Sequence, residues 1–117
     1  MDLLQLARKW LACFDTHDLD TLVGLYAENA RHTSPKLRVS RPETAGHIEG
    51  RAALREWWAD AFRRLPQLRY VERTLTSDGE RVWMEYDRRV PGEPDLPVAE
   101  VLVVHDGLIV ESRVYHG

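Results

Sequence analysis

The sequence predicts an α+β domain in which helices come first along the chain and strands follow. Apolar residues recur with the helical period of 3.6 before residue 66, and the period changes to 2 after residue 68. Asp-Gly pairs and a Pro-rich stretch separate the later segments, as turns between antiparallel strands do. Helices and strands segregated in this way are typical of α+β folds. With 117 residues, the chain has the size of one such domain, so we expect a single domain over residues 1–117.

Three amphipathic helices are expected in the first part of the chain. The first covers residues 3–14, the second follows an N-cap at Asp18, and the third begins after Gly50 and ends at Pro66. Spacings of three and four place the apolar residues of each helix on one face. These residues are Leu3, Leu6, Ala7, Trp10, Leu11 and Phe14, then Leu19, Leu22, Val23 and Tyr26, then Leu54, Trp57, Trp58, Ala61, Phe62 and Leu65.

Four strands are expected in the second part, at residues 68–77, 80–90, 98–105 and 108–116. A short strand near residues 29–34 precedes a polar loop at 36–47, which is a candidate lid. A sheet that curls around a helix leaves a conical space, and ligands favour such mouths. The pattern therefore predicts a pocket between the helices and the sheet.

Composition excludes several classes of function. The chain has 16 Lys and Arg against 19 Asp and Glu, a net charge of -3 without a basic run, so we expect no nucleic-acid partner. Cys13 is the single cysteine, which excludes an intrachain disulfide and favours a reducing, cytoplasmic location. Charges interrupt the apolar residues of the N-terminal segment, so neither a signal peptide nor a membrane anchor is expected.

No familiar cofactor motif is present. The five histidines show neither HxxxH nor HExxH spacing, so we expect no metal site. The sequence also lacks a Gly-rich phosphate loop and a GxSxG elbow, which leaves nucleotide cofactors and serine-hydrolase chemistry without support. We expect no cofactor.

Three segments resemble SnoaL-like proteins of the NTF2-like superfamily. The run 18–35 contains Tyr-Ala-Glu-Asn-Ala at 26–30 and a proline five residues later, and Ile-Glu-Gly-Arg at 48–51 leads into an aromatic-rich helix. The segment from Asp-Gly at 106–107 through Ile109, Glu111, Arg113 and Tyr115 is similar to the closing hairpin of that family. The resemblance implies a cone-shaped α+β barrel, with three N-terminal helices packed on a curved antiparallel sheet around a pocket. It also implies a homodimer formed through the outer sheet face.

The superfamily includes ketosteroid isomerase, polyketide cyclases, limonene epoxide hydrolase and non-catalytic modules, so the pocket residues decide the function. Beside ketosteroid isomerase, the catalytic tyrosine falls at Trp10, the general-base aspartate at Ser34 and the buried acid near Glu100. Two further pocket tyrosines fall at Tyr26, which is kept, and at Trp58. A serine of ordinary pKa cannot take a proton from carbon, so steroid isomerisation by that mechanism is not expected.

Two other enzyme classes of the superfamily can be compared with this chain in the same way, through their catalytic residues. The acid on the last strand of limonene epoxide hydrolase falls at Val114, and Asp87 alone would be half of its dyad. Polyketide cyclases place a base in the last two strands, where this chain offers Glu100, Ser112 and His116.

Strand alternation selects the side chains that face the pocket. His32 shares a face with Ser34, and Glu100 shares one with Leu102 and Val104. The last strand would turn Leu108, Val110, Ser112, Val114 and His116 inward. For strand 80–90 we favour Val82, Met84 and Tyr86 as the inner set. A one-residue slip of register would turn Glu100 to solvent instead. The outer, dimer-forming set would be Arg73, Leu75, Val101, Val103 and Tyr115.

The leading hypothesis is a protein that binds a small hydrophobic molecule and catalyses cofactor-free proton transfer, as an isomerase, cyclase or dehydratase does. His32 and Glu100 are the candidate catalytic pair: the carboxylate would raise the basicity of the imidazole, or Glu100 would stay protonated and donate. His47 is a weaker candidate at the cavity mouth, and His17 and His105 are expected in exposed turns without a role. The expected ligand-binding residues are Trp10, Phe14, Tyr26, Ser34, Trp58, Leu102, Ser112, Val114 and His116. The alternative is a non-catalytic ligand-binding or protein-interaction module.

Overall fold

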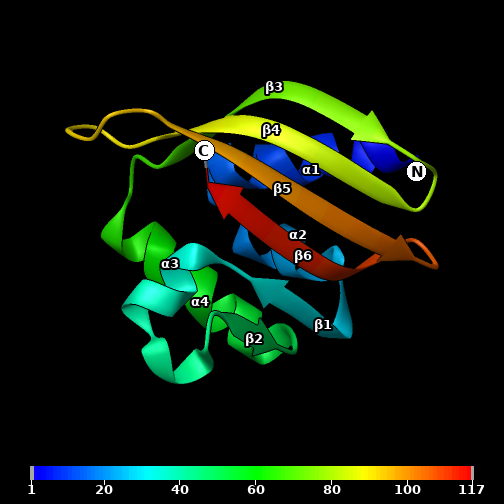
Figure 1. Cartoon of the computed structure of the whole chain (residues 1–117), viewed down its shortest axis with the longest axis horizontal. Coiled ribbons are helices and arrows are strands. Elements are labelled where there is room, and N and C mark those ends of the chain that lie inside the picture. The colour runs from blue at the N-terminus through cyan, green and yellow to red at the C-terminus, as the bar shows by residue number, and fades with distance from the viewer. Residues whose placement is uncertain (1, 117) are drawn as a thin grey trace.

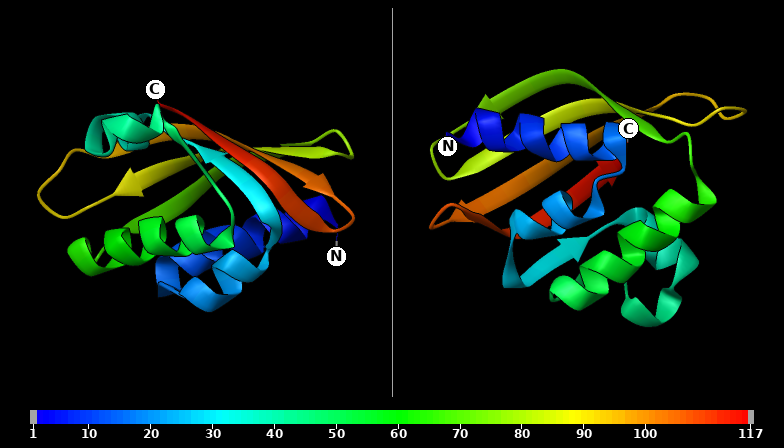
Figure 2. Two further views of the ribbon diagram at one scale, coloured as in Figure 1. Left: turned by 90° about the horizontal axis from the view of Figure 1, so that it is seen from below. Right: turned by 180° about the vertical axis from the view of Figure 1, so that it is seen from behind.

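The computed structural model describes residues 2–116. Its six strands form one curved sheet in the order β2-β1-β6-β5-β4-β3, and α1, α2 and α4 cover one face of it (Figure 1, Figure 2). This arrangement confirms the predicted α+β class. In chain order the elements are α1 (Leu3–Thr16), α2 (Leu19–Gly24), β1 (Tyr26–Thr33), α3 (Pro35–Ser40), the 3-10 helix η1 (Pro42–Thr44), β2 (His47–Glu49), α4 (Arg51–Arg64), β3 (Arg69–Ser77), β4 (Arg81–Arg89), β5 (Leu96–His105) and β6 (Leu108–His116).

The three predicted helices are present as α1, α2 and α4, and side-chain caps begin the first two. Asp2 and Gln5 make a reciprocal capping box at the start of α1, and the Asp18 side chain accepts from the Thr21 N–H at the start of α2. The second helix is shorter than predicted, because Tyr26 opens β1 instead of continuing the helical face. None of the helices within residues 2–116 combines the length and the apolar character needed to cross a membrane.

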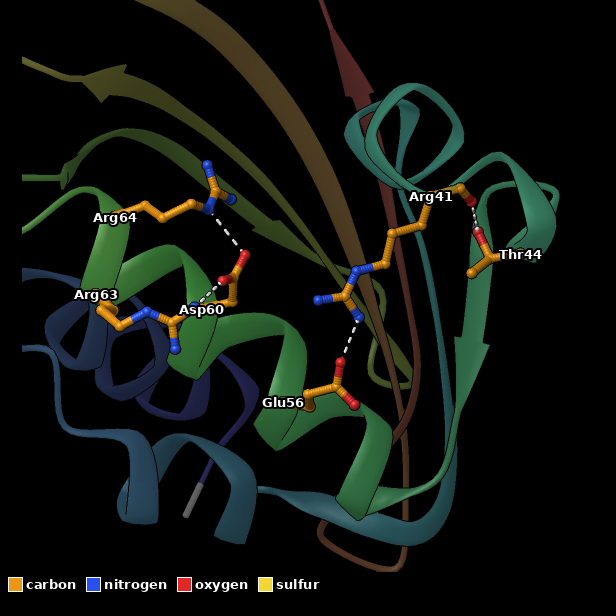
Figure 3. A network of polar contacts seen from close by, with 6 residues as sticks. All are labelled: Arg41, Thr44, Glu56, Asp60, Arg63 and Arg64. Carbon is orange, nitrogen blue, oxygen red and sulfur yellow. Dashed lines mark hydrogen bonds and ion pairs between the residues drawn. The ribbon is translucent and has the colours of Figure 1, made fainter.

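The polar loop predicted after residue 35 is wrong, because this segment forms α3, η1 and the short strand β2. Ser34 caps α3 by accepting from the Lys36 N–H, and Pro35 occupies the first helical position, where its missing N–H costs nothing. The Arg41 guanidinium then donates to Glu56 of α4 at 2.9 Å (Figure 3). The candidate lid is thus a short helical segment tied to α4.

The sheet is mixed, not purely antiparallel as predicted. The strands β3 to β6 form the expected antiparallel meander, but β6 also pairs in parallel with β1. In that pairing His32 lies directly beside Ser112. The parallel contact arises because the last strand of the β3–β6 meander lies beside β1 and points the same way. It joins the early and late halves of the sequence at the pocket.

Two bulges change the predicted inner and outer faces. Val110 has no partner in the β5–β6 register. As a result Ile109 is fully buried in the core, and the prediction that Leu108 and Val110 point inward is wrong. The β3–β4 register skips Arg73, so Leu75 lies opposite Met84 and packs against the core instead of facing outward. Simple alternation fails at these two places because a bulge inserts one unpaired residue.

The outer sheet face carries exposed aromatic side chains. Trp83 is 41% and Tyr115 50% exposed, while Val101 is buried between its cross-strand neighbours Trp83 and Arg113. The inner set predicted for β4, Val82, Met84 and Tyr86, is confirmed by its burial. Dimerisation through the outer face stays a prediction.

The turn into α4 depends on Gly50. Its backbone has φ +92° and ψ 150°, a region that only glycine adopts readily, and a Cβ there would meet nothing closer than 3.7 Å. We predict that Gly50→Ala lowers the free energy of unfolding by about 1 to 3 kcal/mol through backbone strain alone. Gly24→Ala is the control, since a Cβ at Gly24 meets nothing within 4 Å. Urea unfolding of both variants measures the difference, and equal stabilities would show that Gly50 is not strained.

Candidate functional site

A cavity of about 420 Å³ opens between the helices and the inner face of the sheet. Buried side chains such as Trp10 and Glu100 line one part of it, and exposed side chains such as Val39 and Arg64 line the part that opens to solvent, which we call the mouth. The residues at the mouth belong to α3, the end of α4 and the ends of β4 and β6. A cavity of this size can hold a small organic molecule.

Most of the predicted site residues line this cavity. His32, Glu100, Trp10, Phe14, Ser34, Trp58, Val114 and His116 all lie on its wall. Tyr26, Leu102 and Ser112 do not, because they are fully buried behind the wall. The predicted register of β5, with Glu100 pointing inward, is therefore the register of the structure.

The apolar part of the wall is an aromatic cluster. The Phe14 ring stacks on Tyr70 with centroids 4.2 Å apart, and Tyr70 stacks on Tyr86 at 4.3 Å. On the other side, the Trp58 ring lies 5.3 Å from the His32 ring. These contacts hold rigid, flat surfaces around the space and favour a flat, apolar ligand.

A chain of hydrogen bonds runs behind the wall from Trp10 to His32. The Trp10 indole N–H donates to the Tyr26 hydroxyl at 3.0 Å, and the Tyr26 hydroxyl donates to Ser112 Oγ at 2.9 Å. Ser112 Oγ lies 2.6 Å from His32 Nδ1. The indole can only donate, so the Tyr26 hydroxyl accepts from it and donates to Ser112 Oγ. If His32 Nδ1 carried a proton, Ser112 Oγ would accept from both neighbours and its own proton would have no acceptor among the described residues. We therefore infer that Ser112 donates to His32 Nδ1.

This polarity assigns the tautomer of His32. With Nδ1 accepting from Ser112, the proton of the neutral ring is on Nε2. Burial lowers the pKa of His32 to about 4, so the ring is neutral at pH 7. His32 thus offers the cavity a neutral N–H donor.

Glu100 is the buried acid of the site. It is 1% exposed, its Oε1 accepts a hydrogen bond from the Tyr86 hydroxyl at 2.7 Å, and its Oε2 has no hydrogen-bond partner among the described residues. Burial raises the pKa of Glu100 to about 8, and the bond from Tyr86 opposes this only in part. At pH 7 the group is mainly a carboxylic acid, whose proton resides on the unpartnered oxygen.

His32 and Glu100 meet in the cavity without a direct hydrogen bond. His32 Nδ1 lies 3.9 Å from Glu100 Oε2, beyond the reach of about 2.6 to 3.2 Å that a base pair needs. The distance allows an ion pair, but burial favours the neutral form of both groups. Ser112, rather than Glu100, orients the imidazole. Of the two predicted versions, burial, which raises the pKa of Glu100, favours the protonated one, and the catalytic role of the pair stays a prediction.

Other candidates lie away from the cavity. Asp87 is on the opposite face of β4 from Tyr86 and pairs with Arg73 at 3.5 Å. His47 is exposed on β2 and does not line the cavity. The expectation of a freely exposed His17 is wrong, because its ring stacks on Phe62 and its Nε2 lies 2.9 Å from the Leu68 carbonyl. His105 is exposed, as expected.

Several polar wall residues are not among the predicted site residues, notably Lys36, Tyr70, Tyr86 and Arg88. Tyr86 and Arg88 continue the inner set of β4 by simple alternation, so that pattern contained the signal. Tyr70 lies opposite Arg88 across the β3–β4 pair. Lys36 has no signal in the sequence, because the pattern predicts a loop where α3 forms. Within residues 2–116, no three His, Cys, Asp or Glu side chains gather in a way that could hold a metal ion.

We predict that His32 is found as the Nε2–H tautomer. Long-range ¹H–¹⁵N NMR of the histidine rings at pH 7 tests this, with His32→Gln to assign the signals. Ser112→Ala should give a mixture of tautomers, because it removes the donor to Nδ1. An Nδ1–H tautomer in the unchanged protein would show that the chain from Trp10 runs differently.

We predict that stability falls as pH rises from 6.5 to 8, because of Glu100. The folded state keeps this proton up to about pH 8, whereas the unfolded chain loses it near 4.5, so unfolding releases a proton in this interval. The lowered pKa of His32 has the opposite effect, mainly below pH 7. The free energy of unfolding should decrease by about 1 kcal/mol between pH 6.5 and 8.

Urea unfolding at the two pH values measures this decrease. Glu100→Gln should abolish it, and the exposed-residue control Glu80→Gln should retain it. A decrease of the same size in Glu100→Gln would assign it to another group.

Comparison with known proteins identifies the family. The family model described as "SnoaL-like domain" matches residues 7–112. No curated protein matches the chain. A SnoaL-like protein of unknown function from Burkholderia thailandensis has a similar structure, with a TM-score of 0.88 and 23% identity over 97% of this chain and 92% of that one.

Two further structures resemble this chain. One is from Kribbella flavida and described as a candidate ketosteroid isomerase, with a TM-score of 0.78 and 22% identity over 97% of this chain and 76% of that one. The other is from Sinorhizobium meliloti and described as a candidate polyketide cyclase, with a TM-score of 0.77 and 17% identity over 95% and 94%. At these identities the likeness concerns the fold. Since the family model spans most of the chain, the protein belongs to the SnoaL-like family.

Proposed function

We propose that this protein binds a small, largely apolar organic molecule in its cavity and that Glu100 acts on an oxygen atom of that molecule as a neutral acid. The observation that carries the proposal is the buried Glu100 carboxyl group, whose Oε2 has no hydrogen-bond partner among the described residues. A buried polar atom without a partner is costly unless a ligand supplies one. A carbonyl or hydroxyl oxygen would do so.

The pKa of Glu100 suits acid catalysis near neutral pH. A group with a pKa of about 8 is protonated at pH 7 but gives up its proton with little cost. The Tyr86 hydroxyl donates to Oε1 and stabilises the carboxylate that forms. The same carboxylate can then take a proton back from the ligand.

This cycle supports isomerisation, cyclisation or dehydration without a cofactor. In a dehydration, the proton of Glu100 passes to the leaving hydroxyl and the C–O bond breaks to release water. The Glu100 carboxylate then accepts a proton from the neighbouring carbon as the C=C bond forms, which restores the acid. Protons and electrons balance within this cycle, so no oxidant or reductant is required.

His32 would supply a second donor, not the base. Its Nε2–H is neutral because burial lowers the pKa of the ring to about 4. A neutral imidazole N–H next to a carboxylic acid can stabilise negative charge that develops on a ligand oxygen. His32 and Glu100 thus remain the proposed pair, with both groups donating.

A non-catalytic binding protein is the second candidate. The observation that favours it is Ser34, which lies on the cavity wall where the resemblance to ketosteroid isomerase places a base. Binding would use the same acid and the same aromatic walls. Turnover of a bound hydroxy ketone by the unchanged protein, lost in Glu100→Gln, separates catalysis from binding alone.

We predict that the cavity prefers a ketone over a hydrocarbon of the same shape. The matched probes are 2-acetonaphthone and 2-isopropenylnaphthalene, compared by isothermal titration calorimetry. One hydrogen bond from Glu100 is worth about 1 kcal/mol, so the ketone should bind about fivefold or more tightly. Glu100→Leu should abolish the preference, whereas Glu100→Gln should keep it because the amide still donates. Equal affinities in the unchanged protein would remove the proposed role of Glu100.

We also predict that this ketone preference disappears above pH 8. As pH rises through the pKa of Glu100, about 8, the donor becomes a carboxylate that repels the carbonyl oxygen. The preference of Glu100→Gln should be constant between pH 6 and 9. A preference in the unchanged protein that persists at pH 9 would argue that another group holds the oxygen.

A further inference from the structure

The mouth of the cavity collects positive charge. The wall residues at this end include Lys36 of α3, Arg64 at the end of α4, and Arg88 near the end of β4, with Glu93 from the loop that follows. Arg64 is held by Asp60 on its own helix, where Nε donates to Oδ2 at 2.8 Å (Figure 3). With Arg64 paired in this way, the remaining charged wall residues at the mouth are the two cations Lys36 and Arg88 and one carboxylate, that of Glu93.

Arg88 is a buried guanidinium on the inner face of β4. It is 8% exposed, and Nη1 donates to Glu93 Oε1 at 3.0 Å. A guanidinium has five N–H groups in a planar fork that matches a carboxylate, and burial makes each unused donor costly. The Glu93 side chain is 48% exposed on its loop. A ligand carboxylate can therefore displace Glu93, whereas the buried Arg88 side chain stays in place.

The neighbouring titratable groups report the same excess of positive charge. Burial, followed by the charge of Arg88, lowers the pKa of Lys36, and Glu93 opposes this shift. Burial also lowers the pKa of His116, and the charges of Lys36 and Arg88 add to the effect. A ligand anion at the mouth would relieve this repulsion.

The distance between Arg88 and the carboxyl group of Glu100 determines how long a ligand must be to reach both. Tyr86, which holds Glu100, and Arg88 are two residues apart on the same face of β4, or about 7 Å along the strand. Tyr70 lies opposite Arg88 on the neighbouring strand and stacks on Tyr86 with centroids 4.3 Å apart, so an aromatic surface extends from the residue that holds the acid to Arg88. One molecule can therefore reach the acid with an oxygen and the mouth with a charged end.

The geometry points to a carboxylate-binding subsite formed by Arg88 and Lys36, so that the cavity takes an apolar organic acid with its carboxylate at the mouth and a carbonyl or hydroxyl oxygen at Glu100. The orientation of the ligand rests on the proposed function of Glu100. The carboxylate of Glu93 occupies part of the place that the ligand carboxylate would take.

The test compares 6-acetyl-2-naphthoate with its methyl ester by calorimetry at 0.15 M salt. The unchanged protein should bind the acid at least tenfold more tightly than the ester. Arg88→Gln should bring the ratio close to one. Lys36→Gln should lower the ratio about threefold, and Glu93→Gln should raise it by removing the competing carboxylate.

Arg63→Gln is the control for net charge. Arg63 is exposed, pairs with Asp60 and does not line the cavity (Figure 3), so its removal should not change the ratio. Arg88→Gln leaves Glu93 free in solvent, and Lys36→Gln provides an independent reading if the Arg88 variant does not fold. Equal binding of acid and ester, or a ratio that neither variant lowers, overturns the subsite.

The two proposals fail separately. A ketone preference that depends on Glu100, together with equal affinities for acid and ester, would retain the proposed function and overturn the subsite. A preference for the acid that depends on Arg88, without any preference of ketone over hydrocarbon, would overturn the role of Glu100 and the ligand orientation with it.

Discussion

The exclusion of water from Glu100 is the constraint on which the site depends. A carboxyl group surrounded by aromatic rings stays neutral because the cost of burying its charge exceeds what one hydrogen bond from Tyr86 returns. The same dry surroundings keep His32 neutral. The buried part of the cavity wall therefore holds two neutral proton donors at pH 7.

The sheet topology brings these donors together from distant parts of the chain. His32 is on β1 and Ser112 on β6, and their contact exists because these strands pair in parallel. Trp10 of α1 and Tyr26 complete the hydrogen-bond chain from the opposite side. The tautomer of one imidazole thus depends on the relative placement of three elements of the fold, α1, β1 and β6.

Sequence patterns predicted most of the fold and a large part of the cavity wall. Helical spacing around Trp10 and Trp58, and alternation through Glu100, place those residues correctly because both periods follow from backbone geometry alone. The errors occur where a single residue changes the period. Bulges at Arg73 and Val110 turned Leu75 inward and replaced Leu108 by Ile109. Such insertions depend on the partner strand and leave no local mark. The 3.9 Å gap between His32 and Glu100 was equally hidden, because Ser112 takes the contact.

The bulge at Val110 divides β6 into two parts with independent phases. Before it, Ile109 packs with the core; after it, Val114 and His116 follow their own alternation on the cavity wall. Without the extra residue Val110, Ile109 and Ser112 would be two positions apart on a regular strand, and both parts would share one alternation. The strand therefore separates the requirements of folding from those of ligand recognition, and substitutions near its end can change what the cavity accepts without reaching the packing that α1 and α2 require.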